Sequence, residues 1–450
     1  MVKWIGISVA AGLAALAIAV WSNRALLAEA SGTVAQTLCS KTFVTGLPPA
    51  EAYAEHLRPE PGMGLIDWAL HYDVDRVRRE VRASIAGTFA RRSVYRDGRG
   101  CTLVYAEVAL PAPISVQQGD AILPEIAGGE IVVADNARLR AAVDAAFAED
   151  GSGPPRRTKA VVVVHDGRVV AERYAPGYGV NTPLLSHSIA KSVANALAGI
   201  LVQRGDLSVS DVVPAGRGAI TVDSLLRMNA GFGFDEGGGP SRSTQMWFNE
   251  ADTAKFAAQA PLSTPGRWGY SSGGYAILSR IIGDKIGGGP QGVRAFAQSA
   301  LFDPLGMRHV TLEFDARGTM MGANAMFATP RDFARFGLLY LNDGVVGGRR
   351  ILPAGWVAYS TRPTGDAGYG AGFWLNTTDA QIPEWGFRWG LPGAPRDAFM
   401  ARGYLGQYVV MVPSEKLVVV RFGASHGPGA AVDSVGRLVG DAVRSLRAPS

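Results

Sequence analysis

Cysteine is scarce in this sequence: the 450 residues include only two, Cys39 and Cys101. Two cysteines are too few for a small fold held by disulfides or for a zinc site made of four cysteines. The short motifs that mark metal and phosphate sites are also absent, because neither H-E-x-x-H nor a P-loop occurs. The sequence therefore predicts no metal site.

Charged residues are also few. They make up 18% of the chain against 47% hydrophobic residues, which excludes a disordered or fibrous protein and allows a large buried core. Lysine supplies only seven of the 44 basic residues, and arginine is spread along the chain, so the net charge of +5 indicates no nucleic-acid partner. A length of 450 residues predicts one large domain with an appendage, or two domains.

One long apolar run stands at the N-terminus. Residues 5–21 carry no charge and would cover roughly 25 Å as a helix, close to the ~30 Å hydrocarbon core of a membrane. Trp4 and Trp21 flank this run, where aromatic side chains favour the membrane interface. We interpret residues 1–30 as a membrane anchor, and a cleaved signal peptide is the alternative. Either interpretation exports the chain: residues 4–21 would cross a bacterial inner membrane with the rest of the chain in the periplasm, or the cleaved protein would be free there.

Export would place the two cysteines in a compartment where a disulfide can form. In an oxidising compartment Cys39 and Cys101 would form a disulfide, because the pair has no other cysteine to compete for it. Such a bond would close a loop of about 60 residues and contribute about 3–4 kcal/mol to stability. A pair of buried thiols is the alternative.

The sequence pattern becomes regular near residue 136. Residues 31–135 are predicted to form an irregular accessory region that contains both cysteines, whereas residues 136–450 show the periodicity of helices and strands. The expected helices are 138–149, 188–203 and 430–446, and the expected strands are 160–164, 169–174, 408–412 and 417–422. With a largely helical insertion at about 206–360, this order predicts an α+β fold. An antiparallel sheet would be flanked by helices, with the first and last helices on one face, and a helical subdomain would be attached.

Ser188 and Lys191 form the one S-x-x-K string in the chain. Ser188 lies at the start of a predicted helix, where free N–H groups and the positive end of the helix dipole favour an oxyanion. Lys191 projects from the same helical face three residues later, and a partly desolvated lysine there can take the serine proton. A helix-capping serine beside a surface lysine is the alternative.

A second candidate stretch follows 82 residues later. Tyr270 precedes a predicted helix and could relay protons between a nucleophile and a leaving group, and a tyrosine at the edge of the core is the alternative. Residues 269–273 also fit G-x-S-x-G, the nucleophile elbow of α/β-hydrolases, which would make Ser271 the nucleophile. An elbow needs a strand that leads into the turn. The residues before this turn predict a loop, which disfavours Ser271.

The third candidate stretch, residues 399–407, leads into the strand expected at 408–412. Its glycines, Gly403 and Gly406, would let a ligand approach the backbone closely, and an N–H at this strand edge could donate to an oxyanion. Glycines at a twist or bulge are the structural alternative.

Taken in order, these stretches resemble the serine β-lactamase and penicillin-binding protein superfamily, in particular its class C-like esterases and 6-aminohexanoate-dimer hydrolases. The resemblance covers residues 137–446 and includes three further stretches, 224–232, 304–307 and 328–339. It implies the β-lactamase/transpeptidase-like fold for this part of the chain. The region before residue 136 has no counterpart in the resemblance.

The resemblance also implies a mechanism. Ser188 would attack an ester or amide carbonyl, Lys191 and Tyr270 would exchange the proton, and an acyl-enzyme would form and then be hydrolysed. The backbone N–H groups of Ser188 and Tyr404 would form the oxyanion hole, and no metal or organic cofactor is implied. Two residues are assigned supporting roles, Ser272 in the second motif and Gly403 in the third.

Two departures from the family pattern bear on the substrate. The second motif reads Tyr270-x-Ser272 where β-lactamases usually have Tyr-x-Asn, and the third reads Ala401-Arg402-Gly403 in place of Lys-Thr-Gly. Strand alternation is expected to turn Arg402 away from the face of Ala401, so the usual lysine has no replacement. We therefore expect an esterase or amidase that acts on a small-molecule ester or amide, rather than an efficient β-lactamase. The alternatives are a cell-wall peptide carboxypeptidase or transpeptidase, a non-catalytic envelope binding protein and an α/β-hydrolase. The sequence leaves the oligomeric state open.

Overall fold

The structure of the chain is a computed structural model. It describes residues 22–149, 151, 154–213, 220–234, 236, 239–264, 266–377, 381–382, 387–427, 429 and 431–447. The predicted membrane segment, residues 4–21, lies outside the described residues. From Ser22 onward, in the part of the chain that is described, no helix is both long and apolar enough to cross a membrane.

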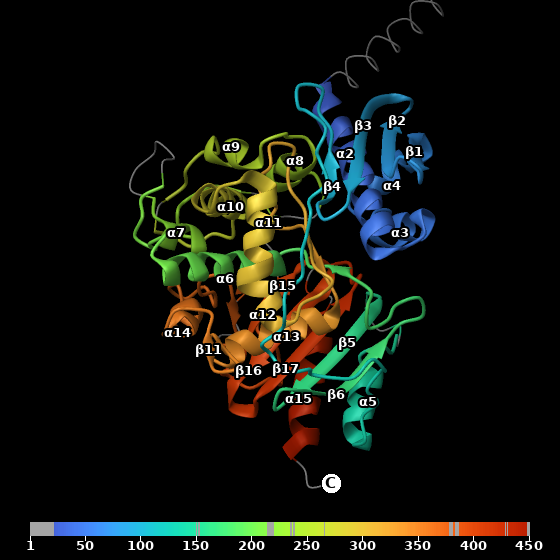
Figure 1. Cartoon of the computed structure of the whole chain (residues 1–450). Coiled ribbons are helices and arrows are strands. Elements are labelled where there is room, and N and C mark those ends of the chain that lie inside the picture. The colour runs from blue at the N-terminus through green and yellow to red at the C-terminus, as the bar shows by residue number, and fades with distance from the viewer. Residues whose placement is uncertain are drawn as a thin grey trace, which may run out of the picture.

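Residues 24–103 form an N-terminal unit in which a helix packs on a four-stranded antiparallel sheet (Figure 1). Its elements are α2 (Arg24–Ser40), η1 (Lys41–Thr45), α3 (Pro49–His56), α4 (Met63–Ile66), η2 (Asp67–Ala69), β1 (Leu70–Asp75), β2 (Glu80–Ile85), β3 (Thr88–Arg96) and β4 (Gly100–Leu103). The expectation of an irregular region is therefore wrong for these residues. The predicted boundary at residue 30 falls inside α2.

The predicted disulfide is confirmed. Cys39, near the end of α2, is bonded to Cys101 in the edge strand β4, with the two Cα atoms 6.0 Å apart. Both residues are fully buried in a small hydrophobic core of the N-terminal unit, together with Val34, Leu38 and Val81. The bond therefore ties the helix to the sheet in a unit that has little apolar surface to bury.

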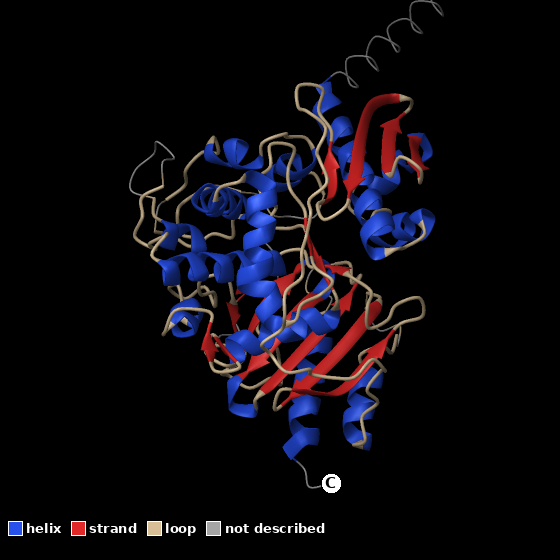
Figure 2. Cartoon of the chain, viewed as in Figure 1, coloured by secondary structure: helices blue, strands red, loops and turns tan. Residues whose placement is uncertain are grey.

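A six-stranded antiparallel sheet forms the centre of the main domain, with the strand order β12-β15-β16-β17-β5-β6 (Figure 2). Its strands are β5 (Thr158–His165), β6 (Arg168–Tyr174), β12 (Trp374–Leu375), β15 (Phe399–Gly403), β16 (Gln407–Val412) and β17 (Leu417–Gly423). β5 and β6 form the predicted hairpin, and Asp166 and Gly167 at its turn both have positive φ, as a type I′ turn requires. The late strand β17 pairs with the early strand β5, so the two ends of the domain meet in one sheet.

Helices cover both faces of this sheet, which confirms the predicted α+β fold. α6 (Ile189–Arg204) and α13 (Pro330–Leu341) lie on one face, and α5 (Ala137–Ala145) packs against α15 (Val432–Arg447) on the other, as expected for the first and last helices. The helical subdomain contains α7 (Val222–Leu226), α8 (Arg242–Phe248), α9 (Thr253–Ala258), α10 (Ser272–Ile286) and α11 (Gly289–Ala297). The shorter elements are β7 (Leu184–Leu185), η3 (Gln298–Phe302), α12 (Asp303–Leu305), β8 (Thr311–Leu312), β9 (Met326–Ala328), β10 (Val345–Val346), β11 (Arg349–Arg350), α14 (Trp356–Thr361), β13 (Gln381–Ile382), β14 (Phe387–Arg388), η4 (Tyr404–Gly406) and η5 (Pro413–Glu415).

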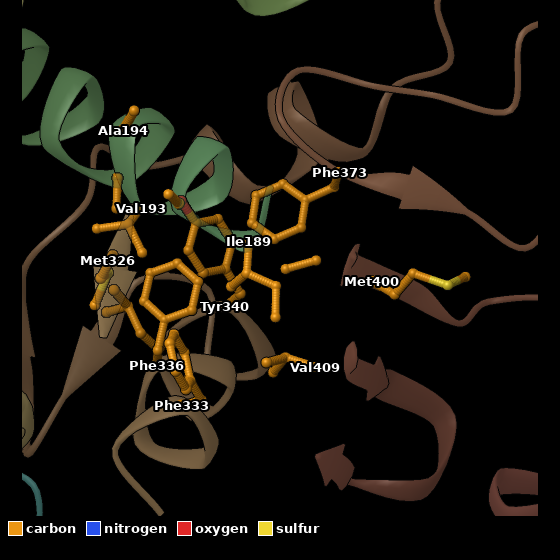
Figure 3. Close-up of a cluster of buried hydrophobic side chains, with 14 of the residues drawn as sticks. Ile189, Val193, Ala194, Met326, Phe333, Phe336, Tyr340, Phe373, Met400 and Val409 are labelled. Atoms are coloured by element: carbon orange, nitrogen blue, oxygen red, sulfur yellow. The ribbon is translucent and has the colours of Figure 1, made fainter. Parts of the chain in front are cut away.

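The main hydrophobic core lies between α6, α13 and the sheet. Ile189 and Val193 of α6 pack with Phe333 and Phe336 of α13, and Val409 of β16 lies beside them (Figure 3). All five side chains are almost completely buried. Because α6 begins at Ile189, this core fixes the position of the residue directly before the helix, Ser188.

Residues 104–135 run as an extended segment from β4 to α5 along the main domain (Figure 1). Backbone N–H groups of the edge strand β6 donate to this segment, Val169 to Ile126 at 2.8 Å and Glu172 to Val132 at 2.8 Å. Leu123 and Ile126 belong to the main core. The predicted accessory region 31–135 is therefore two different parts, the N-terminal unit and a segment that packs on the main domain.

Candidate active site

Ser188 stands directly before α6, at the start of the helix predicted from the apolar periodicity. Its Oγ is 3.0 Å from Nζ of Lys191, one turn further along the helix. The Ser188 side chain is partly exposed, whereas Lys191 is 1% exposed. The nucleophile candidate is therefore accessible while its partner is withdrawn from water. His187, the residue before it, has a φ of 47°, so the chain turns sharply into the helix at this point.

Lys191 donates to three acceptors. Besides Ser188 Oγ, its Nζ contacts Ser272 Oγ at 3.1 Å and the backbone oxygen of Ala323 at 2.8 Å. Burial lowers the pKa of Lys191 from its ordinary 10.5 to about 8, and the negative charge of Glu236 opposes that shift. A lysine with this pKa is partly neutral near physiological pH, which a proton acceptor must be.

Glu236 is a site residue that the sequence reasoning missed. Its carboxylate accepts from Ser272 Oγ at 2.7 Å and from the Ser272 backbone N–H at 2.5 Å. A continuous chain of hydrogen bonds therefore runs from Ser188 through Lys191 and Ser272 to Glu236. Burial raises the pKa of Glu236, and Lys191 and the bonds from Ser272 partly offset this. The available signal was weak: two adjacent acidic residues, Asp235 and Glu236, in a glycine-rich stretch, without a defined spacing to another motif.

Tyr270 lies over the same site. Its hydroxyl is hydrogen-bonded to the Ser188 side chain, and its ring centroid is 4.9 Å from Lys191 Nζ. The ring stacks on Trp374 of the edge strand β12, with centroids 5.6 Å apart and planes 15° apart. Burial raises the pKa of the Tyr270 phenol, although the bond with Ser188 lowers it in part. Tyr270 is therefore a protonated hydrogen-bond partner at neutral pH rather than a phenolate.

Ser271 has a structural position, so the elbow interpretation is wrong. It is the N-cap of α10, and its Oγ accepts from the N–H of Gly274 at 3.1 Å. The side chain is 4% exposed. The described residues before it form loop and turn structure, and the sheet of the domain is antiparallel, whereas an elbow sits on a strand of a largely parallel sheet.

The third motif lies beside the nucleophile. A Cβ added to Gly403 would stand 2.2 Å from the backbone oxygen of Ser186, so this position of β15 must lack a side chain for the two segments to approach. Tyr404 follows, and its ring meets the edge of the His187 ring at 5.7 Å. Within the loop and turn hydrogen bonds of the described residues, neither the Ser188 N–H nor the Tyr404 N–H is a donor. The assignment of these two amides to the oxyanion hole stays a prediction.

Ala401 and Arg402 lie on opposite faces of β15, as alternation predicted. Ala401 is completely buried in the main core. Arg402 is the cross-strand partner of Tyr408 and lies against its ring, with the guanidinium carbon 5.4 Å from the centroid. The same guanidinium is 5.9 Å from the ring of Trp374, and its charge lowers the pKa of Tyr270. The charge of Arg402 therefore acts on Tyr270 and Trp374, although the Arg402 side chain lies on the face of β15 opposite to that of Ala401.

Two partly buried histidines lie near this motif. His187 has a pKa lowered to about 3, chiefly by burial, and its Nδ1 is 3.4 Å from the side-chain oxygen of Asn324. His426 has a lowered pKa for the same reason. Among the described residues, no group of three or more histidine, cysteine, aspartate or glutamate side chains could hold a metal ion.

A serine and a buried lysine at the start of α6, with a tyrosine from a loop beside them and an antiparallel sheet next to the helix, are typical of penicillin-binding protein-like serine hydrolases. The chain belongs to the β-lactamase family: the family model matches residues 143–444, which include all three motifs. The N-terminal unit lies outside this match.

Three relatives illustrate the likeness. The chain is 24% identical over 299 residues to the 6-aminohexanoate-dimer hydrolase of Paenarthrobacter ureafaciens. The aligned residues cover 60% of this chain and 74% of the relative. The structure of EstCE1, a hydrolase with promiscuous acyltransferase activity, matches with a TM-score of 0.53 at 15% identity, over 68% of this chain and 99% of that one. A class C β-lactamase from Rhodobacter sphaeroides matches with a TM-score of 0.51 at 17% identity, over 69% and 99%. The superfamily expected from the sequence is thereby confirmed.

Proposed function

We propose that this protein is an exported, membrane-anchored hydrolase that cleaves small esters or linear amides through an acyl-enzyme on Ser188. The observation that carries the proposal is the 3.0 Å contact between Ser188 Oγ and the buried Nζ of Lys191. Lys191 is buried, has three acceptors and lies near one carboxylate, which disfavours the alternative of a surface lysine beside a helix-capping serine. It fits the role of a proton acceptor for the serine.

In the proposed mechanism, neutral Lys191 takes the Ser188 proton while the serine oxygen bonds to the substrate carbonyl carbon. Two N–H groups, those of Ser188 and Tyr404, stabilise the oxyanion. The carbonyl then re-forms as the bond to the leaving group breaks, and Tyr270 donates its hydroxyl proton to that group and regains one from Lys191. Water attacks the resulting acyl-serine by the same steps in reverse. Tyr270 serves as relay rather than base because its pKa is raised.

The third motif supports the substrate part of the proposal. The position of the usual lysine is held by Ala401, which is buried, and Arg402 faces Tyr408. A substrate carboxylate at the pocket mouth would therefore lack the charged partner that β-lactam-processing relatives supply, a contact typically worth about 1.5–3 kcal/mol. Esters and uncharged amides need no such partner. The relative from Paenarthrobacter ureafaciens is named for the hydrolysis of the 6-aminohexanoate dimer, and this supports the cleavage of amides. That dimer carries a carboxylate of its own, so the name does not support the argument about charge.

Export is proposed on two grounds. Residues 5–21 form the long apolar run of the sequence, and the bonded pair Cys39 and Cys101 is typical of an oxidising compartment. Fractionation of cells that express the full chain tests this part. We expect the protein in inner-membrane fractions after alkaline washing, with the main domain open to protease added to the periplasmic side. Recovery from the cytoplasm would contradict export, and recovery from an osmotic-shock fluid would indicate a cleaved signal peptide.

Hydrolysis of p-nitrophenyl butyrate by serine variants tests the catalytic part. Ser188→Ala should lose all hydrolysis above the uncatalysed rate. Ser271→Ala is the matched control, because it removes a neighbouring motif serine that only caps α10, and it should keep most of its activity. An active Ser188→Ala variant would contradict the proposal.

A further inference from the structure

The N-terminal unit is firmly docked on the main domain by a buried carboxyl. Glu313, directly after β8, accepts from Ser40 Oγ at 2.7 Å and from the backbone N–H of Cys101 at 2.9 Å. Gln36 Nε2 donates to its other oxygen at 3.0 Å. Burial raises the pKa of Glu313 to about 7. Gln36 and Ser40 lie on α2 on either side of Cys39, and Cys101 of β4 is the other half of the disulfide. The unit is therefore held in one orientation, although it lies outside the family match.

One loop of this docked unit, residues 57–62, reaches the candidate active site. Glu60 Oε2 accepts from the Tyr404 hydroxyl at 2.9 Å. The next residue, Pro61, lies against Gly239: a Cβ added to that glycine would be 3.1 Å from Pro61 Cβ. Gly239 follows Glu236 by three residues in the loop that bonds Ser272. The loop therefore touches both the segment that carries the second oxyanion donor and the loop that carries Glu236.

His426 is a second neighbour of Glu60. Its Oε1 is 3.5 Å from Nδ1 of His426, and His426 Nε2 is 2.8 Å from the backbone oxygen of Glu55. A carbonyl oxygen can only accept, so Nε2 carries the proton, and Nδ1 of the neutral ring is an acceptor. A glutamine at position 60 could satisfy both neighbours, because its oxygen would accept from Tyr404 and its amide N–H would donate to Nδ1.

The Tyr404 turn needs such support. Leu405, the next residue, has a φ of 60° and a ψ of 21°, a left-handed conformation that is uncommon for a residue with a side chain. Backbone contacts hold the later part of the turn, where the Leu405 oxygen accepts from Ser425 N–H at 3.0 Å and the Gly406 oxygen accepts from Arg421 at 2.7 Å. At Tyr404 itself, the backbone oxygen accepts from Gln407 Nε2 at 3.0 Å, and the bond from the hydroxyl to Glu60 fixes the side chain.

From these contacts we infer that Glu60 is a positioning residue of the active site: through the Tyr404 hydroxyl it holds the backbone N–H that completes the oxyanion hole. The N-terminal unit is then part of the working enzyme rather than a separate appendage. The inference rests on the proposed function, since it assigns the second oxyanion donor of that mechanism. Because an oxyanion donor acts in the transition state, the loss should fall on kcat rather than on KM.

Steady-state hydrolysis of p-nitrophenyl butyrate by the full chain tests this. Complete removal of an oxyanion donor lowers kcat by about 10²–10³-fold, so a donor that is only loosened should cost about 10–100-fold. We expect this loss for both Glu60→Ala and Tyr404→Phe, with KM changed less than about twofold and unchanged thermal unfolding. The double variant should be no worse than either single variant, because both break one hydrogen bond. Glu60→Gln should stay within about threefold of the wild type.

Glu51→Ala is the matched control, because this exposed glutamate of α3 precedes the same loop, and it should behave as the wild type. Wild-type kcat in both Glu60→Ala and Tyr404→Phe would overturn the inference. Multiplying losses in the double variant, or a Glu60→Gln variant as slow as Glu60→Ala, would overturn it as well. A wild-type protein without any esterase or amidase activity would instead refute the proposed function, so the two failures can be distinguished.

Discussion

The pKa of Lys191 predicts how the acylation rate depends on pH. Burial lowers this pKa from 10.5 to about 8. Only the neutral amine can accept the Ser188 proton, so the rate should rise with pH and level off above about 8. The neutral fraction is about 1% at pH 6, about 10% at pH 7 and about 90% at pH 9. At pH 7 the shift makes the neutral form about 300 times more abundant than for a lysine of ordinary pKa.

A Glu236→Gln variant tests the cause of this profile. The charge of Glu236 opposes the shift that burial imposes on Lys191. Removing that charge should therefore lower the Lys191 pKa further and move the rising limb to lower pH. Glu250→Gln is the matched control: Glu250 is also a carboxyl with a raised pKa, but it contributes nothing to the shift of Lys191. Its limb should coincide with that of the wild type.

The assay measures kcat/KM for p-nitrophenyl acetate from pH 6 to 9.5 at constant ionic strength, with the uncatalysed rate subtracted. Because this quantity reports the free enzyme, its limb corresponds to Lys191 before substrate binds. A flat profile, or a limb centred near 10, would refute Lys191 as the base. A limb that moves to higher pH in Glu236→Gln would refute the electrostatic argument.

Three further predictions follow from the same structure. Lys191→Ala and Tyr270→Phe should each slow acylation by about 10²–10⁴-fold, and single-turnover kinetics of the double variant should show strong non-additivity, whereas independent losses would mean two separate proton paths. Replacing both Cys39 and Cys101 by alanine should lower the free energy of unfolding by about 3–4 kcal/mol in a urea titration, and an unchanged midpoint and slope would contradict a contribution from the disulfide. Short p-nitrophenyl esters should be hydrolysed with a kcat/KM at least ten- to a hundredfold above that for penicillins or cephalosporins, and faster turnover of a cephalosporin would show that the third motif has been misinterpreted.

The parts of the site that the sequence predicted are those fixed by local geometry. Ser188 and Lys191 are one helical turn apart, so their contact follows from helix geometry once the helix is located. Ala401 and Arg402 are neighbours in a strand, so their opposite faces follow from alternation. The central strands were recognisable because both faces are covered, which gives continuous valine runs such as residues 161–164.

The parts that the sequence did not predict depend on contacts between distant segments. Glu236 reaches Ser272 across 36 residues, and Glu60 reaches Tyr404 across 344. No spacing rule relates such pairs. The α2 helix was missed because it buries polar and small residues: a Cβ on Gly32 would stand 2.1 Å from the backbone oxygen of Phe248. A helix whose small residues let another backbone segment pack closely against it shows little of the apolar periodicity by which helices are recognised.

The sheet of the N-terminal unit was missed for a related reason. In β2 the buried residues Val81, Ala83 and Ile85 alternate with Arg82 and Ser84, so the strand pattern is present. It is short, however, and only one face is covered. The surrounding arginines and turn residues made the region resemble a polar loop, and the tertiary contact with α2 decides the structure.

Identification of the covalently modified serine tests the central claim most directly. The full-length protein is treated with a fluorophosphonate, digested, and analysed by peptide mass spectrometry. We predict one adduct, on the peptide that contains Ser188, with labelling slowed in Lys191→Ala and lost in Ser188→Ala. An adduct on Ser271, or esterase activity that survives without any adduct on Ser188, would contradict the account.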